Sequence, residues 1–260
     1  AAGSVIMGVH HNQDIRYMGG LRKYMPITWL TSLLGSLALI GTPLFSGFYS
    51  KDSIIEAVAA SHLPAAQWAH FAVLAGVFVT AFYSFRMYFL VFHGKERFDQ
   101  DPHAHHDSHG HSHTPHESPW VVTLPLVLLA IPSVGIGYLT MDDMLFGDFF
   151  SDAIRVNAVA HPAMTELREA FHSPWAMAEH ALTSVPFGLA MAGVLTAFYM
   201  YMVHPAVPAF IQRRLSPLHS LLMNKYFLDD FNEKILARGT RWLATGLWLS
   251  LIHISEPTRP

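Results

Sequence analysis

Four long stretches without Asp, Glu, Lys or Arg constrain the fold of this chain most strongly. They lie between Lys23 and Lys51, between Glu56 and Arg86, between Glu117 and Asp142, and between Glu179 and Arg213. Each exceeds the roughly 20 mainly apolar residues that a helix needs to cross a hydrocarbon core about 30 Å thick. Lipid leaves the backbone to satisfy its own hydrogen bonds, so such segments cross as helices. The sequence therefore predicts an all-α, multi-span integral membrane protein. We expect its crossing helices near 26–60, 65–92, 119–140 and 174–203.

The low charge content favours the membrane interpretation over the alternative, four buried helices of a large soluble protein. Only 13% of the 260 residues are charged, against roughly 25% in an ordinary soluble domain. The 16 Lys and Arg and the 19 Asp and Glu leave a net charge of −3, so we expect no nucleic-acid partner. The chain has no Cys, which excludes disulfides and cysteine-ligated iron–sulfur clusters. It also lacks a glycine-rich nucleotide motif, and we expect no cofactor in this chain.

Basic residues flank the predicted helices on one side. Lys and Arg in short loops collect on the cytoplasmic side of a membrane. If each helix crosses once, the following residues share that side: Arg16, Arg22, Lys23, Lys95, Arg97, Arg213, Arg214 and Lys225. Of the two opposite loops, 61–64 carries no charge and 141–144 is acidic. We expect Arg86, near the cytoplasmic end of its helix, to extend toward the interface.

The segments outside the predicted helices divide the rest of the chain. We expect 1–25 to hold the end of a preceding transmembrane helix and a cytoplasmic loop, because the chain begins at Ala1 and reads as an internal piece of a longer protein. We expect a His-rich cytoplasmic loop at 93–118 and an outer loop with a short interfacial helix at 141–173. Residues 204–250 have the pattern of an amphipathic cytoplasmic-side segment. The end, 251–260, changes character abruptly and is predicted to be a non-native tail.

A low-complexity tract at 101–116 contains seven His. Neutral imidazole is the commonest metal ligand, so the tract could coordinate zinc, nickel or copper. Its irregular spacing, its two Pro and the lack of Cys favour a solvated linker that binds metal weakly. A metal-ion carrier would need ligand pairs inside its spans, which offer only the scattered His70 and His204. We expect both to be interfacial or packing residues.

The first predicted span is too long for one straight crossing. Residues 26–60 would extend about 52 Å at 1.5 Å per residue. The motif Gly41-Thr-Pro-Leu-Phe-Ser-Gly47 offers a break, since Pro43 cannot donate a backbone hydrogen bond and glycine is flexible. Inside lipid, freed backbone groups are tolerated only where protein or trapped water satisfies them, and transporters use such broken helices as ion sites. The sequence predicts one discontinuous transmembrane helix with a wet patch beside it.

Three ionisable residues follow this break. Lys51 and Asp52 are adjacent, and Glu56 lies one helical turn beyond Asp52. An ionisable group inside a span is costly and usually faces a polar cavity, which makes Lys51 the strongest candidate for a functional residue. The alternative is that Lys51 anchors the helix at the far interface, that 54–60 is a surface turn, and that the break is only a proline kink. Spacing alone leaves both open.

Several motifs of this chain have the order and spacing of one known family. They are Ala2-Gly-Ser-Val-Ile6, His10-His-Asn-Gln-Asp-Ile-Arg16, Met18-Gly-Gly-Leu-Arg-Lys23, Gly41-Thr-Pro-Leu-Phe-Ser-Gly-Phe-Tyr-Ser-Lys-Asp52, Tyr83-Ser-Phe-Arg-Met-Tyr88 and Phe92-His-Gly94. The chain resembles the antiporter-like membrane subunits of the proton-pumping NADH-quinone oxidoreductase, respiratory complex I. The resemblance covers about residues 1–250 and is clearest in the first hundred.

The resemblance implies a function and a site. It implies a membrane-arm subunit that translocates protons, coupled to NADH oxidation and quinone reduction in other subunits, with Lys51 and Asp52 as the proton-translocating residues. The flavin and iron–sulfur clusters of such a complex belong to other subunits. The implied partners are other membrane-arm subunits and the lipid bilayer, and the implied location is the inner (plasma) membrane of a bacterium. Further charged residues of the pathway would precede Ala1.

Two rival functions remain at the level of the sequence. One is the large subunit of a multisubunit sodium/proton antiporter, which resembles complex I subunits and keeps a similar broken helix and Ser-Lys-acid motif. The motifs at 10–16 and 41–47 favour the complex I family. The other is the metal-ion carrier suggested by the His-rich tract.

Overall fold

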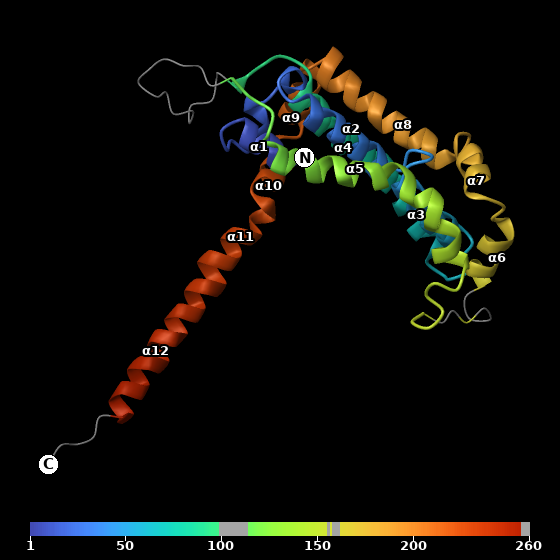
Figure 1. Cartoon of the computed structure of the whole chain (residues 1–260). Coiled ribbons are helices and arrows are strands. Elements are labelled where there is room, and N and C mark those ends of the chain that lie inside the picture. The colour runs from blue at the N-terminus through green and yellow to red at the C-terminus, as the bar shows by residue number, and fades with distance from the viewer. Residues whose placement is uncertain (99–113, 155–156, 158–161, 256–260) are drawn as a thin grey trace. The chain divides into compact units, whose positions relative to one another are not determined.

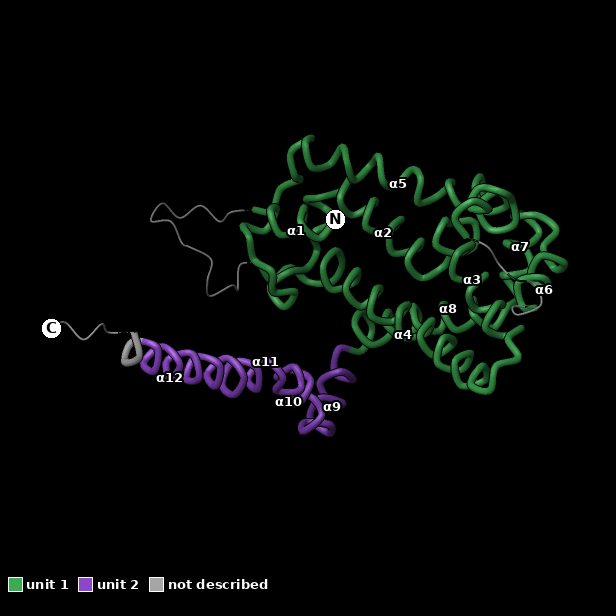
Figure 2. The backbone as a smooth tube through the Cα atoms, turned by 90° about the horizontal axis from the view of Figure 1, so that it is seen from below, with its two compact units in different colours: residues 1–204 green, residues 205–260 purple. Residues whose placement is uncertain are grey.

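The computed structural model describes the chain except for residues 99–113, 155–156, 158–161 and 256–260. The described residues form helices, turns and loops and contain no strand, which confirms the all-α prediction. They divide into two compact units, Ala1–His204 and Pro205–Pro260, coloured separately in Figure 2. Most of the His-rich tract lies outside the described residues, so the metal-binding hypothesis for it stays a prediction.

The first unit contains the predicted spanning segments (Figure 1). Its helices are α1 (Ala2–Gly8), α2 (Pro26–Ile40), α3 (Ser46–Ala59), α4 (Ala66–Phe92), α5 (Trp120–Met141), α6 (Pro162–Ala170), α7 (Pro174–Ala181) and α8 (Val185–Phe198). Short 3₁₀ turns occur at Ile15–Tyr17 and Leu21–Lys23, and wider π-helical turns extend α5 through Asp142–Phe146 and α8 through Tyr199–Val203.

Among the described residues, three helical segments are long and apolar enough to cross a bilayer. They are Ala66–Phe92, Trp120–Phe146 and Val185–Val203, and the apolar Pro26–Ile40 is shorter. Their outward side chains are large and hydrophobic: Trp68 is 77% exposed and Trp120 73% exposed. So much exposed apolar surface requires lipid or other membrane helices around it. The chain is therefore an integral membrane protein, as the sequence predicted.

The predicted helix at 174–203 is two helices in the structure. α7 ends at Ala181, and a short turn separates it from α8. The Ser184 hydroxyl accepts a hydrogen bond from the Phe187 amide at 3.4 Å, and Pro186 occupies the first turn of α8. A serine cap followed by proline starts a new helix at this point. The absence of charged residues in this part of the sequence therefore predicted an apolar region, but it did not predict where its helices begin and end.

Helix packing in this unit relies on small residues. α4 packs along α8, where Ala81, Ala190 and Ala197 are buried. A side chain at Gly193 would approach the Phe78 carbonyl oxygen at 2.6 Å, so the two backbones are too close for anything larger than glycine. Small residues provide such contacts between membrane helices, where the hydrophobic effect does not drive association. α2 and α3 both pack on α4 and on α5.

Several polar contacts join the loop before α2 to the end of α4. Lys23 pairs with Glu96 at 3.1 Å, and the Arg97 guanidinium donates to the Met18 carbonyl oxygen at 2.8 Å. These basic residues therefore lie at the same end of the first unit. Arg86, expected to extend toward the interface, instead donates to the Tyr201 hydroxyl at 2.9 Å and lies over that ring. It links α4 to the turn after α8.

The second unit contains short helices followed by a longer one. They are α9 (Ala206–Arg214), α10 (Ser216–Met223), α11 (Leu228–Phe231) and α12 (Arg238–Ser255), with a 3₁₀ turn at Lys225–Phe227 and a π-helical turn at Asn232–Ala237. Helix α12 continues past residue 251, so the backbone shows no boundary where the non-native tail was predicted to begin. Residues 256–260 lie outside the described part.

Candidate functional site

The predicted interruption lies between α2 and α3. α2 ends at Gly41, whose φ of 76° is left-handed. The Gly41 amide donates to the Ala38 carbonyl, and the Thr42 amide donates to the Leu37 carbonyl. These paired bonds are a Schellman motif, which satisfies the last carbonyl groups of a helix and needs glycine at the left-handed position. The chain then leaves the helix direction, and Pro43 is buried in the linking segment.

α3 begins directly against α2 and α5. A side chain at Gly47 would overlap the Ala38 carbonyl, so the two half-helices touch backbone to backbone. The Ser46 hydroxyl donates to the Ser133 carbonyl of α5 at 3.0 Å. Leu44, in the link, has a φ of 75°, an unfavourable conformation for a branched side chain. The interruption between α2 and α3 thus contains a strained residue, Leu44, and a close backbone contact at Gly47.

Lys51 returns toward the break. Its Cδ lies 3.7 Å from the position that a Cβ on Gly41 would occupy, and the side chain is half-buried. A small cavity of about 30 Å³ lies there, lined by residues of four segments: Gly41, Pro43, Lys51, Asp52, Ala181 and Ser184 among others. A water molecule needs at least about 10–15 Å³, so the cavity has room for water beside the amine. The cavity lies where the sequence predicted a wet patch, and its hydration stays a prediction.

The two carboxylates lie on one face of α3 at different depths. Asp52 is buried, with 8% of its surface exposed, whereas Glu56 is exposed. Residues four apart share a helix face, so Asp52 and Glu56 are neighbours and repel each other when both are ionised. Lys51, Asp52 and Glu56 therefore run from the interior of the interruption to the surface of α3.

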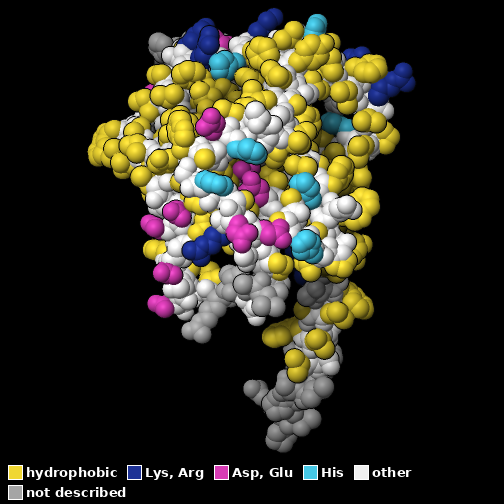
Figure 3. Space-filling model, turned by 90° about the vertical axis from the view of Figure 1, so that its right-hand side faces the viewer, with side chains coloured by type: hydrophobic (Ala, Val, Ile, Leu, Met, Phe, Trp, Pro, Cys, Tyr) yellow, Lys and Arg dark blue, Asp and Glu magenta, His cyan; other side chains and the backbone are white. Residues whose placement is uncertain are grey.

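A second, larger cavity lies on the other side of Asp52. Its volume is about 360 Å³, and Ser53, Glu56, His172 and His180 line it together with apolar residues from α6, α7 and the end of α5. His180, on α7, interacts electrostatically with both Asp52 and Glu56. The sequence analysis missed His180, because nothing in the chain order indicates that α7 lies beside α3. In Figure 3, His and acidic side chains gather on one face that is otherwise largely hydrophobic.

The described residues provide no metal site. Outside the omitted segments, no group of three or more His, Cys, Asp or Glu side chains is arranged to hold an ion. His70 lines a separate cavity of about 270 Å³ with His62, and the His204 ring lies 5.0 Å from the Tyr199 ring. Both contacts fit the expected packing or interfacial roles.

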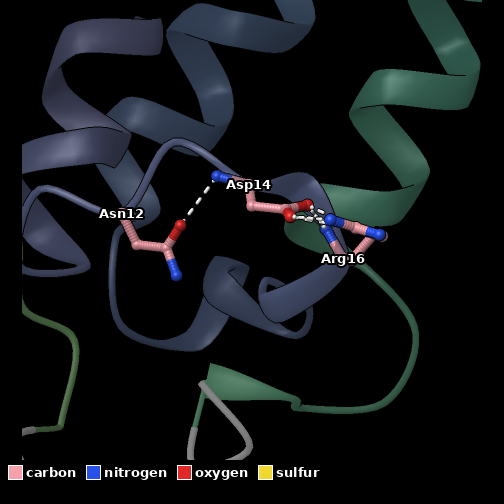
Figure 4. A network of polar contacts seen from close by, with 3 residues as sticks. All are labelled: Asn12, Asp14 and Arg16. Atoms are coloured by element: carbon pink, nitrogen blue, oxygen red, sulfur yellow. Dashed lines mark hydrogen bonds and ion pairs between the residues drawn. The ribbon is translucent and has the colours of Figure 1, made fainter. Parts of the chain in front are cut away.

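The motif at 10–16 forms a different polar network, at the loop after α1 (Figure 4). Asn12 accepts from the Asp14 amide at 2.7 Å, and Asp14 accepts from the amide and guanidinium of Arg16, the shortest contact being 2.6 Å. The hydrogen bonds from Arg16 lower the pKa of the Asp14 carboxyl. These bonds close within five residues of sequence and point to a role in shaping the loop.

Fold and site together describe a membrane protein whose broken helix carries a lysine and an acid, an arrangement similar to that of antiporter-like membrane proteins. Comparison with known proteins agrees. The family described as "NADH:quinone oxidoreductase/Mrp antiporter, TM" matches residues 1–82, which include the whole interruption.

Curated relatives show which proteins the chain is similar to over its length. NADH-quinone oxidoreductase subunit L of Neisseria meningitidis is 56% identical over 95% of this chain and 38% of the relative. NAD(P)H-quinone oxidoreductase chain 5 of Synechocystis is 35% identical over 94% of this chain and 39% of the relative. Subunit L of Mycobacterium tuberculosis is 34% identical over 91% of this chain and 34% of the relative. The chain spans little more than a third of these relatives. The family resemblance read from the motifs is confirmed: over most of its length the chain is homologous to subunit L.

Proposed function

We propose that this chain is part of a membrane-arm subunit of a proton-pumping NADH:quinone oxidoreductase. In this proposal the subunit translocates protons across the membrane, coupled to NADH oxidation and quinone reduction in other subunits, and the enzyme as a whole is a proton-translocating oxidoreductase. The observation that carries it is Lys51, which lies beside a water-sized cavity at the break in a membrane helix. The 56% identity to a subunit L supports the same assignment.

Lys51 and Asp52 are the proposed proton-translocating residues. The Lys51 ammonium would release a proton to water in the small cavity, and Asp52 would stabilise the ammonium before release. Both residues line the small cavity, and in this proposal a change of charge at either one alters the free energy of the other through that cavity. Moving one proton against 100 mV requires about 2.3 kcal/mol, which the redox reaction in other subunits would supply. This chain itself carries no proposed cofactor.

The proposed setting follows from the relatives. We infer that other membrane-arm subunits of the complex and the lipid bilayer surround this chain. The location is the bacterial inner (plasma) membrane, with NADH, quinone, flavin and iron–sulfur clusters handled elsewhere in the complex. The large exposed apolar side chains of α4 and α5 support such surroundings.

The test is Lys51→Ala in the full-length subunit, assembled in its complex in inverted membrane vesicles. NADH-driven acidification of the lumen should fall at least about tenfold while the complex still assembles, because a positioned acid–base group supplies at least that much. Ser50→Ala is the matched control, since Ser50 is exposed and bonds only within its own turn. Loss of assembly with normal pumping per assembled complex would contradict the proposal.

A sodium/proton antiporter is the second candidate, because the matching family description also includes Mrp antiporters. The two functions differ in their energy source. Collapse of a sodium gradient in vesicles without NADH would support the antiporter, whereas acidification that depends on NADH and ignores sodium supports the pump. The metal-ion carrier receives no support from the arrangement of the described side chains.

A further inference from the structure

Neighbouring residues of α3 and of α7 line two different cavities. On α3, Asp52 lines the small cavity at the break, and the next residue, Ser53, lines the large one. On α7, Ala181 lines the small cavity, and its neighbour His180 lines the large one. These two pairs of neighbouring residues therefore join the lining of the lysine's cavity to that of the 360 Å³ cavity.

Among the residues that the structure describes, the ionisable groups that face the large cavity come from two places. α3 contributes Glu56, with Asp52 behind it, and the α6–α7 region contributes His172 and His180. α5, its π-helical extension and α6 contribute apolar or small side chains there, including Met141, Phe146 and Leu167. The Nδ1 atom of His172 already contacts the Ala170 carbonyl oxygen at 2.9 Å. His180 is the histidine that interacts electrostatically with both Asp52 and Glu56.

The members of this group differ in exposure. Asp52 is 8% exposed and Lys51 half-buried, whereas Glu56 and His180 are exposed. Glu56 is near the end of α3, which leads into the 60–65 connection, a loop predicted to lie on the outer side. A route that begins at the amine thus passes the buried Asp52 and ends at exposed groups on that side.

We propose that His180, assisted by Glu56, receives the proton that leaves the Lys51–Asp52 pair and releases it to water on the outer side. The inference rests on the proposed function and adds an exit residue to it. One N–H bond of the Lys51 ammonium breaks and leaves the neutral amine. The proton crosses by water and the Asp52 carboxylate, and a new N–H bond forms on the neutral His180 imidazole. The imidazolium then loses a proton to cavity water, which regenerates His180.

The chemistry of the lining fits this role. Imidazole gains and loses protons in the pH range of living cells, which carboxylates and amines in water do not. The Glu56 carboxylate stabilises the imidazolium while it exists, since opposite charges attract more strongly beside apolar walls than in bulk water. The cavity volume is many times that of one water molecule, so proton transfer through water is possible along its length.

The test compares four variants of the full-length subunit in the assembled complex. In inverted vesicles, His180→Gln should lower the initial rate of NADH-driven lumen acidification by about threefold to tenfold. The loss is below the 10²-fold typical of a dry site, because water in the cavity accepts part of the protons. Glu56→Gln should lower it by about twofold. His172→Gln changes the same cavity by an equal volume and should keep the wild-type rate. His180→Ala should regain rate when imidazole is added to the lumen, which a merely structural role would not produce.

The outcomes separate this inference from the proposed function. If Lys51→Ala abolishes pumping but His180→Gln pumps normally, the exit role is wrong and the pump stands. If His172→Gln loses as much as His180→Gln, cavity hydration rather than His180 carries the proton. If neither Lys51→Ala nor His180→Gln changes pumping, both proposals fail. If the complex with His180→Gln does not assemble, two other measurements decide: the pumping rate of Glu56→Gln and the rescue of His180→Ala by imidazole. If Glu56→Gln pumps at the wild-type rate and imidazole does not rescue His180→Ala, the exit role of His180 is wrong.

Discussion

Helix α5 and the α2–α3 segment are both apolar and both contain proline in their interior, but of these two only the α2–α3 segment is interrupted. α5 includes Pro125 and Pro132 and still runs as a single helix from Trp120 to Met141. The segment of α2 and α3 contains one internal proline, Pro43, and divides there. Proline removes one backbone hydrogen bond and bends a helix. The comparison shows that proline alone does not divide a membrane helix.

Left-handed backbone makes the difference. Gly41 and Leu44 both have φ near 75°, whereas no residue of α5 has a positive φ. A residue of this conformation turns the chain out of the helix direction. Two such residues within four positions therefore end α2 and let α3 begin in a new direction. The segments also differ in charge: α5 has no ionisable Asp, Glu, Lys or Arg, and α3 has Lys51, Asp52 and Glu56. The irregular backbone occurs where polar groups and water can satisfy it.

The largest effect is expected at Gly47. Gly47→Ala places a Cβ on the Ala38 backbone, which cannot move aside as a side chain can, so we expect a loss of about 3 kcal/mol in the free energy of unfolding. The matched change in the uninterrupted helix is Gly135→Ala, where a Cβ meets nothing within 4 Å. That variant should be neutral or stabilised by up to about 1 kcal/mol. Denaturant titration of the full-length subunit in micelles measures both, and equal values would remove the distinction between the segments.

A smaller loss is expected at Gly41. Gly41→Ala forces an alanine into left-handed backbone, at a cost of about 1–2 kcal/mol. The same titration should also show that Leu44→Gly does not destabilise, because glycine relieves strain at that position. A Gly41→Ala variant as stable as the parent chain would mean that the Schellman ending of α2 is not needed for the break.

The effect of proline itself should be smaller again. Pro43→Ala leaves both left-handed residues in place, so the break and NADH-driven pumping should persist, with a change in stability below about 1.5 kcal/mol. Pro132→Ala in α5 restores an amide to a helix that is already continuous and should leave pumping unchanged. Loss of pumping in Pro43→Ala, with assembly intact, would show that proline rather than glycine maintains the interruption.

The smallest effect concerns pH and the first half-helix. The Trp29 indole on α2 donates to His93 Nε2 at 3.3 Å, at the end of α4. Burial lowers the pKa of His93, and Arg22 lowers it further. A lowered pKa means that the unfolded chain binds the proton more readily, so this contribution to stability is present above about pH 6.5 and is lost as the pH falls below it.

The measurement is the free energy of unfolding by denaturant titration at pH 8 and at pH 5.5. His93→Gln, which keeps an acceptor but does not titrate in this range, should show less change between the two pH values than the parent chain. A pH dependence of equal size in the variant would assign the effect to other groups. α5 has no comparable titratable contact among the described side chains, so this dependence belongs to the interrupted segment.

Local sequence signals predicted the break but not its surroundings. Gly41, Pro43 and the charges after them indicate an interruption because each acts on its own stretch of backbone. Leu44 gives no warning of its left-handed conformation, since that is imposed by packing of the two half-helices. The Ser184-Val-Pro186 signal for a new helix was present but was hidden within a long uncharged run. His180 could not be predicted at the site, because its place beside Glu56 depends on how α7 folds back.

The contact between Gly47 and Ala38 also limits how this region can work. With no side chain between the two main chains, a shift of α3 by one position would drive Ser46 or Phe48 into a carbonyl group. The contact between the two half-helices is thus rigid and cannot act as a hinge. In the proposed proton translocation the two half-helices would therefore stay fixed, and the moving parts would be protons, water and the free end of the Lys51 side chain.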